Sequence, residues 1–146
     1  MQQVSLDSID AFARTLLASL PATQGACVLA LSGDLGAGKT ALTQALGRAL
    51  GVTQKIPSPT FLVMRSYAAT HPRFKKLVHI DAYRLDDPRE LEQLGFRVLL
   101  KEPGVLIAIE WASRVAALLP RDAVHLSLKP GRIPDEREVS FGPSAA

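Results

Sequence analysis

The sequence predicts an α/β fold: a three-layer sandwich with a mostly parallel central sheet and a C-terminal antiparallel hairpin. Three observations lead to this prediction. Short apolar runs alternate with helical patterns along the chain, two of these runs end in a carboxylate, and a glycine-rich loop joins a third run to a helix. A length of 146 residues suits one domain, so we expect a single domain over 1–146, with residues 142–146 as a flexible tail.

The composition is that of a globular chain, with 47% apolar residues, 21% charged residues and a net charge of +3. This mild surplus permits an anionic partner but is too small for a dedicated duplex-binding protein. The single cysteine, Cys27, excludes an internal disulfide, and its apolar neighbours predict a buried position. No apolar run is long enough to cross a bilayer, and residues 1–4 lack the basic start of a signal peptide. We therefore expect a cytoplasmic protein without a membrane partner.

The first half of the chain predicts a helix, a strand and a second helix. Asp7 is a suitable N-cap for a helix with one apolar stripe, which Pro21 stops. Residues 26–31 form a wholly apolar run, as in a strand that is buried on both faces. After a glycine-rich loop, apolar residues return with helical spacing as far as Leu50, and Gly51 is a natural end of this second helix.

The second half predicts a helical region and five more strands. Asp87 is a suitable N-cap for a helix with proline at its first position, which stops near Gly95 and is followed by a short helical piece up to Leu100. Apolar or alternating runs predict the strands, of which the last two form the arms of an antiparallel hairpin. These runs cover residues 60–67, 77–81, 105–109, 124–128 and 137–141.

The strongest chemical signal is the P-loop pattern Gly33-x-x-x-x-Gly38-Lys39-Thr40. It lies between a predicted strand and a predicted helix, where glycines let backbone N–H groups surround a phosphate chain. Lys39 adds positive charge at the β- and γ-phosphates, and the Thr40 hydroxyl is placed to ligate Mg²⁺. The fold is therefore expected to be P-loop NTPase-like, with a nucleotide bound by Asp34, Leu35, Gly36, Ala37, Gly38, Lys39 and Thr40.

The remaining sequence favours ATP over GTP. Guanine-specific members of this class use an Asn-Lys-x-Asp stretch, whose aspartate receives the guanine amino group, and this sequence contains no asparagine. It also lacks the Asp-x-x-Gly stretch that contacts the γ-phosphate in GTPases.

Two carboxylates end neighbouring apolar runs, Asp81 after residues 77–80 and Glu110 after residues 105–109. If both strands are parallel to the P-loop strand, both acids emerge at the carboxyl edge of the sheet, where open α/β sheets bind ligands. We expect Asp81 to be a ligand of the metal. Glu110 is either a second metal ligand or the group that orients the attacking water, so the expected catalytic residues are Lys39, Asp81 and Glu110.

Other residues leave alternatives open. Thr60 lies on the loop after the P-loop helix, where it reaches the γ-phosphate or belongs to a plain turn. Arg84 is expected to have a structural or partner-contact role rather than to stabilise a transition state, and His79 to be a packed strand residue rather than a ligand. Trp111 belongs either to the core or to an interface.

Four stretches in this order and spacing resemble the TsaE (YjeE) family of small bacterial P-loop ATPases. They are residues 33–40, Ser58-Pro59-Thr60-Phe61, residues 79–85 and Ile109-Glu110-Trp111, and the resemblance covers about residues 5 to 130. The P-loop alone is shared by many families, whereas the four stretches together are specific. This sequence departs from many members in having Ala41, rather than a second threonine, after the P-loop threonine.

The resemblance implies a role in threonylcarbamoyladenosine synthesis at position 37 of tRNA. TsaE proteins work with TsaD, which transfers the threonylcarbamoyl group, and with its scaffold TsaB. By similarity, this protein would hydrolyse ATP with Mg²⁺, weakly alone and faster on the TsaB–TsaD pair, and would meet tRNA only through that complex. Lys39 would contact phosphate, Thr40 and Asp81 would hold Mg²⁺, Glu110 would serve the metal or the water, and Thr60 would lie on a switch-like loop.

Two other functions remain open. A small-molecule or nucleotide kinase would need an arginine-bearing lid, for which only residues 65–76 are available. A non-catalytic nucleotide-binding module would signal by docking alone. Residues 35–80 also contain seven basic side chains and no acidic one, a stretch that is either solvated surface, which we favour slightly, or a face for an anionic partner.

Overall fold

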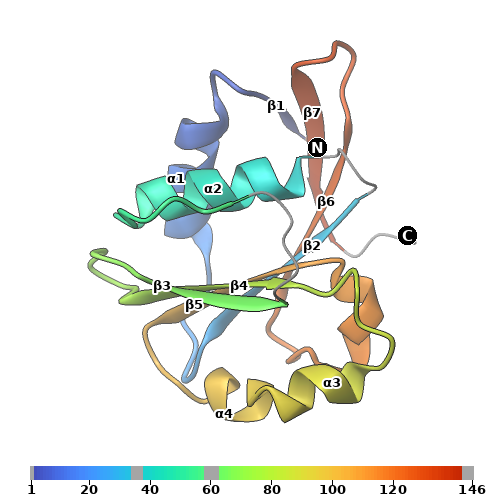
Figure 1. Ribbon diagram of the computed structural model, residues 1–146. Helices are drawn as coiled ribbons and strands as arrows, with labels where there is room; N and C mark the ends of the chain where they lie inside the picture. The colour runs from blue at the N-terminus through green and yellow to red at the C-terminus, as the bar shows by residue number, and fades with distance from the viewer. Residues whose placement is uncertain (1, 34–37, 58–62, 143–146) are drawn as a thin grey trace.

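A seven-stranded mixed sheet runs through the centre of the protein in the computed structural model, which describes residues 2–33, 38–57 and 63–142 (Figure 1). The strand order is β1-β7-β6-β2-β5-β4-β3. The four central strands are parallel, whereas the hairpin β6–β7 and both edge strands pair antiparallel. The strands are β1 (Gln2–Ser5), β2 (Cys27–Ser32), β3 (Met64–Ala68), β4 (Lys76–Asp81), β5 (Val105–Glu110), β6 (Val124–Pro130) and β7 (Glu136–Phe141).

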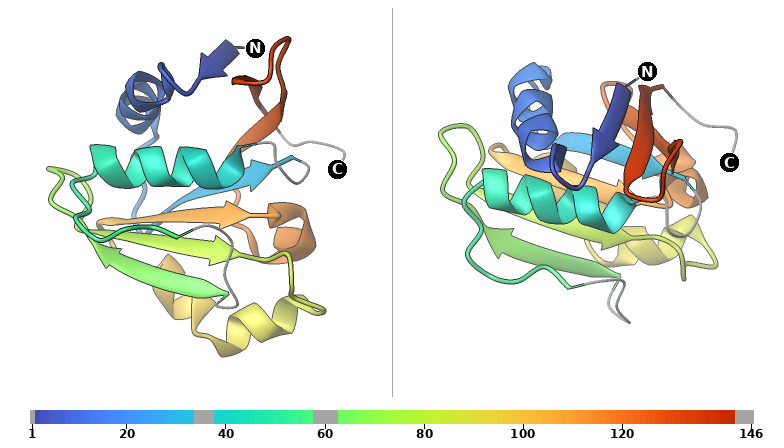
Figure 2. Two further views of the ribbon diagram at one scale, coloured as in Figure 1. Left: turned by 45° about the horizontal axis from the view of Figure 1, so that its top comes forward. Right: turned by 90° about the horizontal axis from the view of Figure 1, so that it is seen from above.

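Helices cover both faces of this sheet. In Figure 1, α1 and α2 lie above the sheet and α3 and α4 lie below it, and Figure 2 shows the same layers from two other sides. The helices are α1 (Ile9–Ser19), α2 (Lys39–Ala49), α3 (Pro88–Gln93), α4 (Phe96–Leu100) and the 3₁₀ helix η1 (Ala112–Leu118). The predicted three-layer α/β architecture with its mostly parallel centre is therefore confirmed.

The central strands are buried on both sides, which explains their unbroken apolar sequences. Leu29 and Leu31 of β2 belong to the core under α1 and α2, while Val28 and Ala30 belong to the core above α3, α4 and η1. Cys27 is fully buried at the start of β2, as expected, and burial raises the pKa of its thiol.

Some boundaries differ from those predicted. Helix α1 begins after Ser8 rather than after Asp7, because the Ser8 hydroxyl accepts a hydrogen bond from the Ser5 backbone N–H at 2.9 Å and closes the turn there. Strand β3 begins at Met64. Residues 60–62 of the predicted strand and residues 143–146 of the predicted tail lie outside the described residues.

Two elements were not predicted at all. Strand β1 is short, with Val4 as its one buried residue, and its partner β7 is more than 130 residues away in the sequence. The helix η1 directly follows its N-cap Trp111, and tryptophan is not one of the residues that typically mark the start of a helix.

Strand register brings the ends of three strands to one edge. Leu31 of β2 is opposite Glu110 of β5, which in turn is opposite Asp81 of β4. The P-loop leaves β2 at this same edge, one residue after Ser32. Among the described residues, no helix is both long enough and apolar enough to span a membrane.

Candidate functional site

Two glycines with positive φ frame the P-loop, Gly33 with φ 145° and Gly38 with φ 98°. Gly38 is the N-cap of α2, so its left-handed backbone sets the direction in which the helix starts. A Cβ atom at this position would also lie 3.3 Å from Cγ of Arg137 on β7. Both the backbone angle and the close Arg137 side chain therefore favour glycine here.

Lys39 is buried at the first position of α2, with 4% of its surface exposed. Its ammonium group donates a hydrogen bond to the Gly33 carbonyl and lies 4.3 Å from the centroid of the Trp111 ring. The lysine charge is thus held across the mouth of the loop, between a backbone oxygen and an aromatic face.

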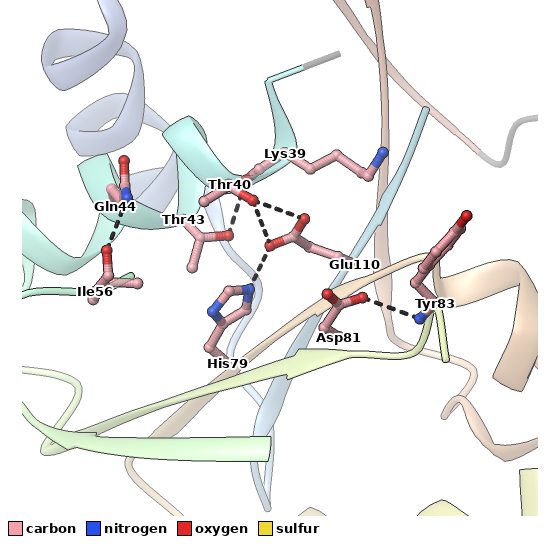
Figure 3. Close-up of polar contacts among 9 residues, drawn as sticks. All are labelled: Lys39, Thr40, Thr43, Gln44, Ile56, His79, Asp81, Tyr83 and Glu110. Carbon is pink, nitrogen blue, oxygen red and sulfur yellow. Dashed lines mark hydrogen bonds and ion pairs between the residues drawn. The ribbon is translucent and has the colours of Figure 1, made fainter. Parts of the chain in front are cut away.

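Thr40, Glu110 and His79 form a continuous polar chain from α2 to the sheet (Figure 3). The Thr40 hydroxyl lies 3.1 Å and 3.2 Å from the two carboxylate oxygens of Glu110. On the other side, Nε2 of His79 lies 2.5 Å from Oε2 of Glu110. Glu110 is 3% exposed and His79 is 9% exposed, so this chain is shielded from bulk water.

Asp81 lies beside Glu110 at the end of β4 and is half-buried. Its Oδ1 accepts a hydrogen bond from the backbone N–H of Tyr83 at 3.0 Å, which fixes the carboxylate at the sheet edge (Figure 3). In the described part of the chain, no three His, Cys, Asp or Glu side chains gather as a metal cluster. The potential metal ligands that meet here are one hydroxyl and two carboxylates. Mg²⁺ prefers hard oxygen ligands of this kind and keeps several of its bound waters.

Trp111 is partly buried and packs against the core on the α3 and α4 side of the sheet. It has a left-handed backbone, with φ 58° and ψ 42°, and its ring contacts the Tyr83 ring at a centroid distance of 5.0 Å. The Arg114 guanidinium lies 5.4 Å above Tyr83. Trp111 is thus one member of an aromatic and cationic stack that ends at Lys39.

A cavity that sequence reasoning missed opens beside the P-loop. It lies between β1, the start of α1, β7 and the first turn of α2, and its lining is mainly apolar. Its lining residues include Val4, Phe12, Gly38, Ala41, Arg137 and Val139. Because these residues come from both ends of the chain, no local motif could reveal the cavity.

The structure brings together Gly38, Lys39, Thr40, Asp81 and Glu110 of the predicted site. Asp34, Leu35, Gly36, Ala37 and Thr60 lie outside the described residues. His79, which we expected to be only a packed strand residue, contacts Glu110 directly.

Three basic residues of the stretch 35–80 are engaged within the protein. Arg48 pairs with Asp10 at 2.8 Å and Lys76 pairs with Glu102 at 3.1 Å. Arg73 donates to the Leu20 carbonyl at 2.7 Å and also to the Pro21 carbonyl. These contacts favour ordinary surface over a face for an anionic partner. They also argue against an arginine lid, because Arg73 is tied to the end of α1.

The fold and the site together define a P-loop nucleotide-binding protein of the α/β class. A glycine-framed loop joins a buried parallel strand to a helix that begins with lysine and threonine, and acids end the neighbouring strands. The family model described as "Threonylcarbamoyl adenosine biosynthesis protein TsaE" matches residues 4–139. The chain belongs to the TsaE family.

Individual relatives agree with this assignment. A tRNA threonylcarbamoyladenosine biosynthesis protein TsaE from Bacillus subtilis is 38% identical over 114 residues, which are 78% of this chain and 68% of that protein. The protein of the same name from Treponema pallidum is 38% identical over 102 residues, 70% of this chain and 72% of the relative. For the relative from Nostoc, 43% identical over 97 residues, the match spans 64% of this chain and 56% of the relative's length.

A solved structure supports the fold as well. The crystal structure of Bacillus subtilis YdiB superposes with a TM-score of 0.68 at 29% sequence identity. The superposition covers 96% of this chain and 84% of the other. The three-layer arrangement is therefore shared over nearly the whole chain.

Proposed function

We propose that the protein is a Mg²⁺-dependent ATPase that supports threonylcarbamoyladenosine modification of tRNA at position 37. The observation that carries this proposal is the contact between Thr40 at the start of α2 and Glu110 at the end of β5, with Asp81 beside them. Oxygen donors from three elements thus converge at the loop that would hold the phosphates. We take residues 1–146 as one domain for this activity.

The nucleotide would lie across the N-terminus of α2. Backbone N–H groups of the P-loop and the positive end of the helix would face its phosphates, and Lys39 would exchange the Gly33 carbonyl for a phosphate oxygen. The apolar cavity next to Gly38 would take the adenosine half, since it adjoins the loop and offers Phe12, Val4 and Val139 for contact with a flat base. This extends the sequence-based nucleotide site toward β1 and β7.

Thr40, Asp81 and Glu110 would hold Mg²⁺, either directly or through its waters. When bound, the ion neutralises charge on the phosphates. The Thr40 hydroxyl would then turn from Glu110, which frees one carboxylate oxygen to accept from a water near the γ-phosphate. Asp81 would keep its bond from the Tyr83 N–H through Oδ1, which leaves Oδ2 for the ion or its waters.

The partners are proposed from the family. TsaD and TsaB would carry out the chemistry on tRNA, and this protein would act on that complex through its ATPase cycle, slowly when alone and faster when docked. Because tRNA is the final substrate, the proposal places the protein in the cytoplasm.

ATPase activity with and without the TsaB–TsaD pair, and with and without tRNA, tests this proposal. We expect Mg²⁺-dependent phosphate release that rises when the pair is added. Hydrolysis that stays at background with both partners present would favour a non-catalytic nucleotide-binding module. Transfer of labelled phosphate to a small acceptor faster than to water would favour a kinase.

A further inference from the structure

His79 makes a contact that packing alone does not require. It lies in the middle of β4, and its Nε2 is 2.5 Å from Oε2 of Glu110, the last residue of the neighbouring strand β5. The imidazole is 9% exposed and the carboxylate is 3% exposed. A contact this short between two buried polar groups fixes the orientation of both side chains, because each group has few other partners within reach.

Strand register explains how the two side chains meet. His79 is directly opposite Ala108, and Glu110 is two residues further along β5 on the same face of the sheet. Because Ala108 has only a methyl side chain, the imidazole has room to lean across it toward Glu110. A larger residue at position 108 would close this path.

The two carboxylate oxygens of Glu110 have different hydrogen-bonding partners. The Thr40 hydroxyl carries a single proton, yet it lies 3.1 Å from Oε1 and 3.2 Å from Oε2, so it can satisfy only one oxygen well. Nε2 of His79 is the second group within hydrogen-bonding distance of the carboxylate, and it reaches Oε2 alone. Since an ionised carboxylate can only accept hydrogen bonds, the imidazole must carry its proton on Nε2.

We propose that His79 is a positioning residue for Glu110: its Nε2–H fixes the carboxylate against the first turn of α2 and holds it there when Thr40 turns away. The inference rests on the proposed ATPase function and adds to it a residue that touches neither nucleotide nor metal. Of the two groups that contact the Glu110 carboxylate, the Thr40 hydroxyl is the one that would turn to the bound ion, so the contact with His79 is the one that stays.

Substitution of His79 separates positioning from packing. His79→Leu introduces an apolar side chain of similar length and removes the imidazole N–H. We expect kcat for ATP hydrolysis to fall about 10- to 100-fold while KM for ATP stays unchanged. His79→Gln retains an N–H donor and should recover part of this loss. His125→Leu is the matched control, because His125 is a half-buried histidine on β6 outside the site, and its kcat should equal that of the wild type.

The imidazole itself provides a readout that does not depend on activity. In ¹⁵N-labelled protein without nucleotide, we expect His79 to carry a slowly exchanging proton on Nε2, whose ¹H and ¹⁵N shifts move in Glu110→Gln and stay unchanged in Asp81→Asn. A wild-type His79 protonated only on Nδ1 would overturn the inference even if all substituted variants failed to fold. Identical His79 shifts in the wild type and in folded Glu110→Gln would overturn it as well.

The kinetic and spectroscopic results together distinguish the two proposals. A wild type that hydrolyses no ATP with its partners refutes the ATPase proposal, whereas the NMR shifts still decide whether His79 holds Glu110. Equal kcat values for His79→Leu and the wild type in an active preparation refute positioning by His79 and leave the ATPase proposal intact.

Discussion

The ammonium group of Lys39 lies 4.3 Å from the centroid of the Trp111 ring. This contact depends on the backbone of Trp111, whose φ of 58° turns the chain sharply from β5 into η1. A left-handed backbone at a bulky residue costs about 1–2 kcal/mol. The surrounding contacts with Lys39 and Tyr83 offset that strain, so the aromatic ring and the P-loop lysine stabilise each other.

Lys39→Ala should weaken ATP binding. The substitution removes a charge-assisted hydrogen bond to phosphate, which corresponds to an affinity about 10- to 100-fold lower. Isothermal titration with ATP and Mg²⁺ measures this change, and Lys101→Ala is the control because Lys101 is exposed at the end of α4. Equal affinities for the two variants would contradict the phosphate role of Lys39.

Asp81→Asn should abolish the Mg²⁺ dependence of turnover while the fold stays intact. The amide preserves an oxygen for the Tyr83 N–H but lowers the negative charge available to the ion. We expect a loss of kcat of more than about 100-fold, since metal stabilisation of charge contributes several kcal/mol. Rates measured across a Mg²⁺ titration test this, and a normal rate would show that Asp81 is not a metal ligand.

Glu110→Gln keeps the shape of the side chain and removes its charge. If Glu110 orients water, turnover should fall by about 10²- to 10⁴-fold with ATP affinity retained. If Glu110 is a metal ligand instead, the apparent affinity for Mg²⁺ should fall as well. Single-turnover hydrolysis combined with direct nucleotide binding separates the two roles, and unchanged turnover would exclude both.

Gly25→Ala should destabilise the fold without touching the site. A Cβ atom at this position would lie 2.1 Å from the Leu100 carbonyl oxygen, and backbone atoms cannot rotate away as a flexible side chain can. The same carbonyl accepts a hydrogen bond from the Ala26 N–H at 2.9 Å, so the two segments would be forced apart. We expect a loss of about 1–3 kcal/mol in urea unfolding.

Gln24→Ala changes an exposed residue of the same loop and serves as the control for Gly25. Its free energy of unfolding should stay within about 0.5 kcal/mol of the wild type. A similar loss for both variants would show that the loop, rather than the contact with Leu100, is the cause.

Asp87 should make the stability of α3 depend on pH. Its side chain accepts from the Arg89 N–H at 2.9 Å, and hydrogen bonds from the Arg89 side chain and backbone lower the pKa of the carboxyl below its ordinary value of 3.8. A lowered pKa means that this stabilisation is present above about pH 4 and is lost as the pH falls through the folded-state value.

Thermal unfolding tests the role of Asp87. Asp87→Ala should have a lower Tm than the wild type at pH 7, and the difference should shrink below pH 4. Asp86 is a neighbouring exposed residue outside the cap, so the Tm of Asp86→Ala should equal that of the wild type at pH 7 and below pH 4. A constant difference between Asp87→Ala and the wild type at all pH values would contradict the capping role.

The centre of the fold was predictable because its signals are local. Residues 26–31 and 105–109 are unbroken apolar runs, and the left-handed Gly38 between a strand and a helix is required by the P-loop pattern. The alignment of Asp81 with Glu110 also follows from strand ends in a parallel sheet.

The remaining features depend on contacts between distant residues. Strand β1 has one buried side chain, Val4, so its pattern resembles a loop until β7 is placed beside it. The contact of His79 with Glu110 depends on the small residue Ala108, which no spacing rule identifies. The contact of the Trp111 ring with Lys39 became evident only when the backbone angle and the neighbours of Trp111 were known.

The pairing of β1 with β7 also constrains the order of events during synthesis. The first strand of this chain is made early, but it has no partner until Glu136–Phe141 has left the ribosome. The central strands and α2 can assemble before then, whereas the cavity beside Gly38 forms only after β7 has paired with β1. Such a long-range step slows folding, and the cavity lacks its β7 wall until Glu136–Phe141 has been made.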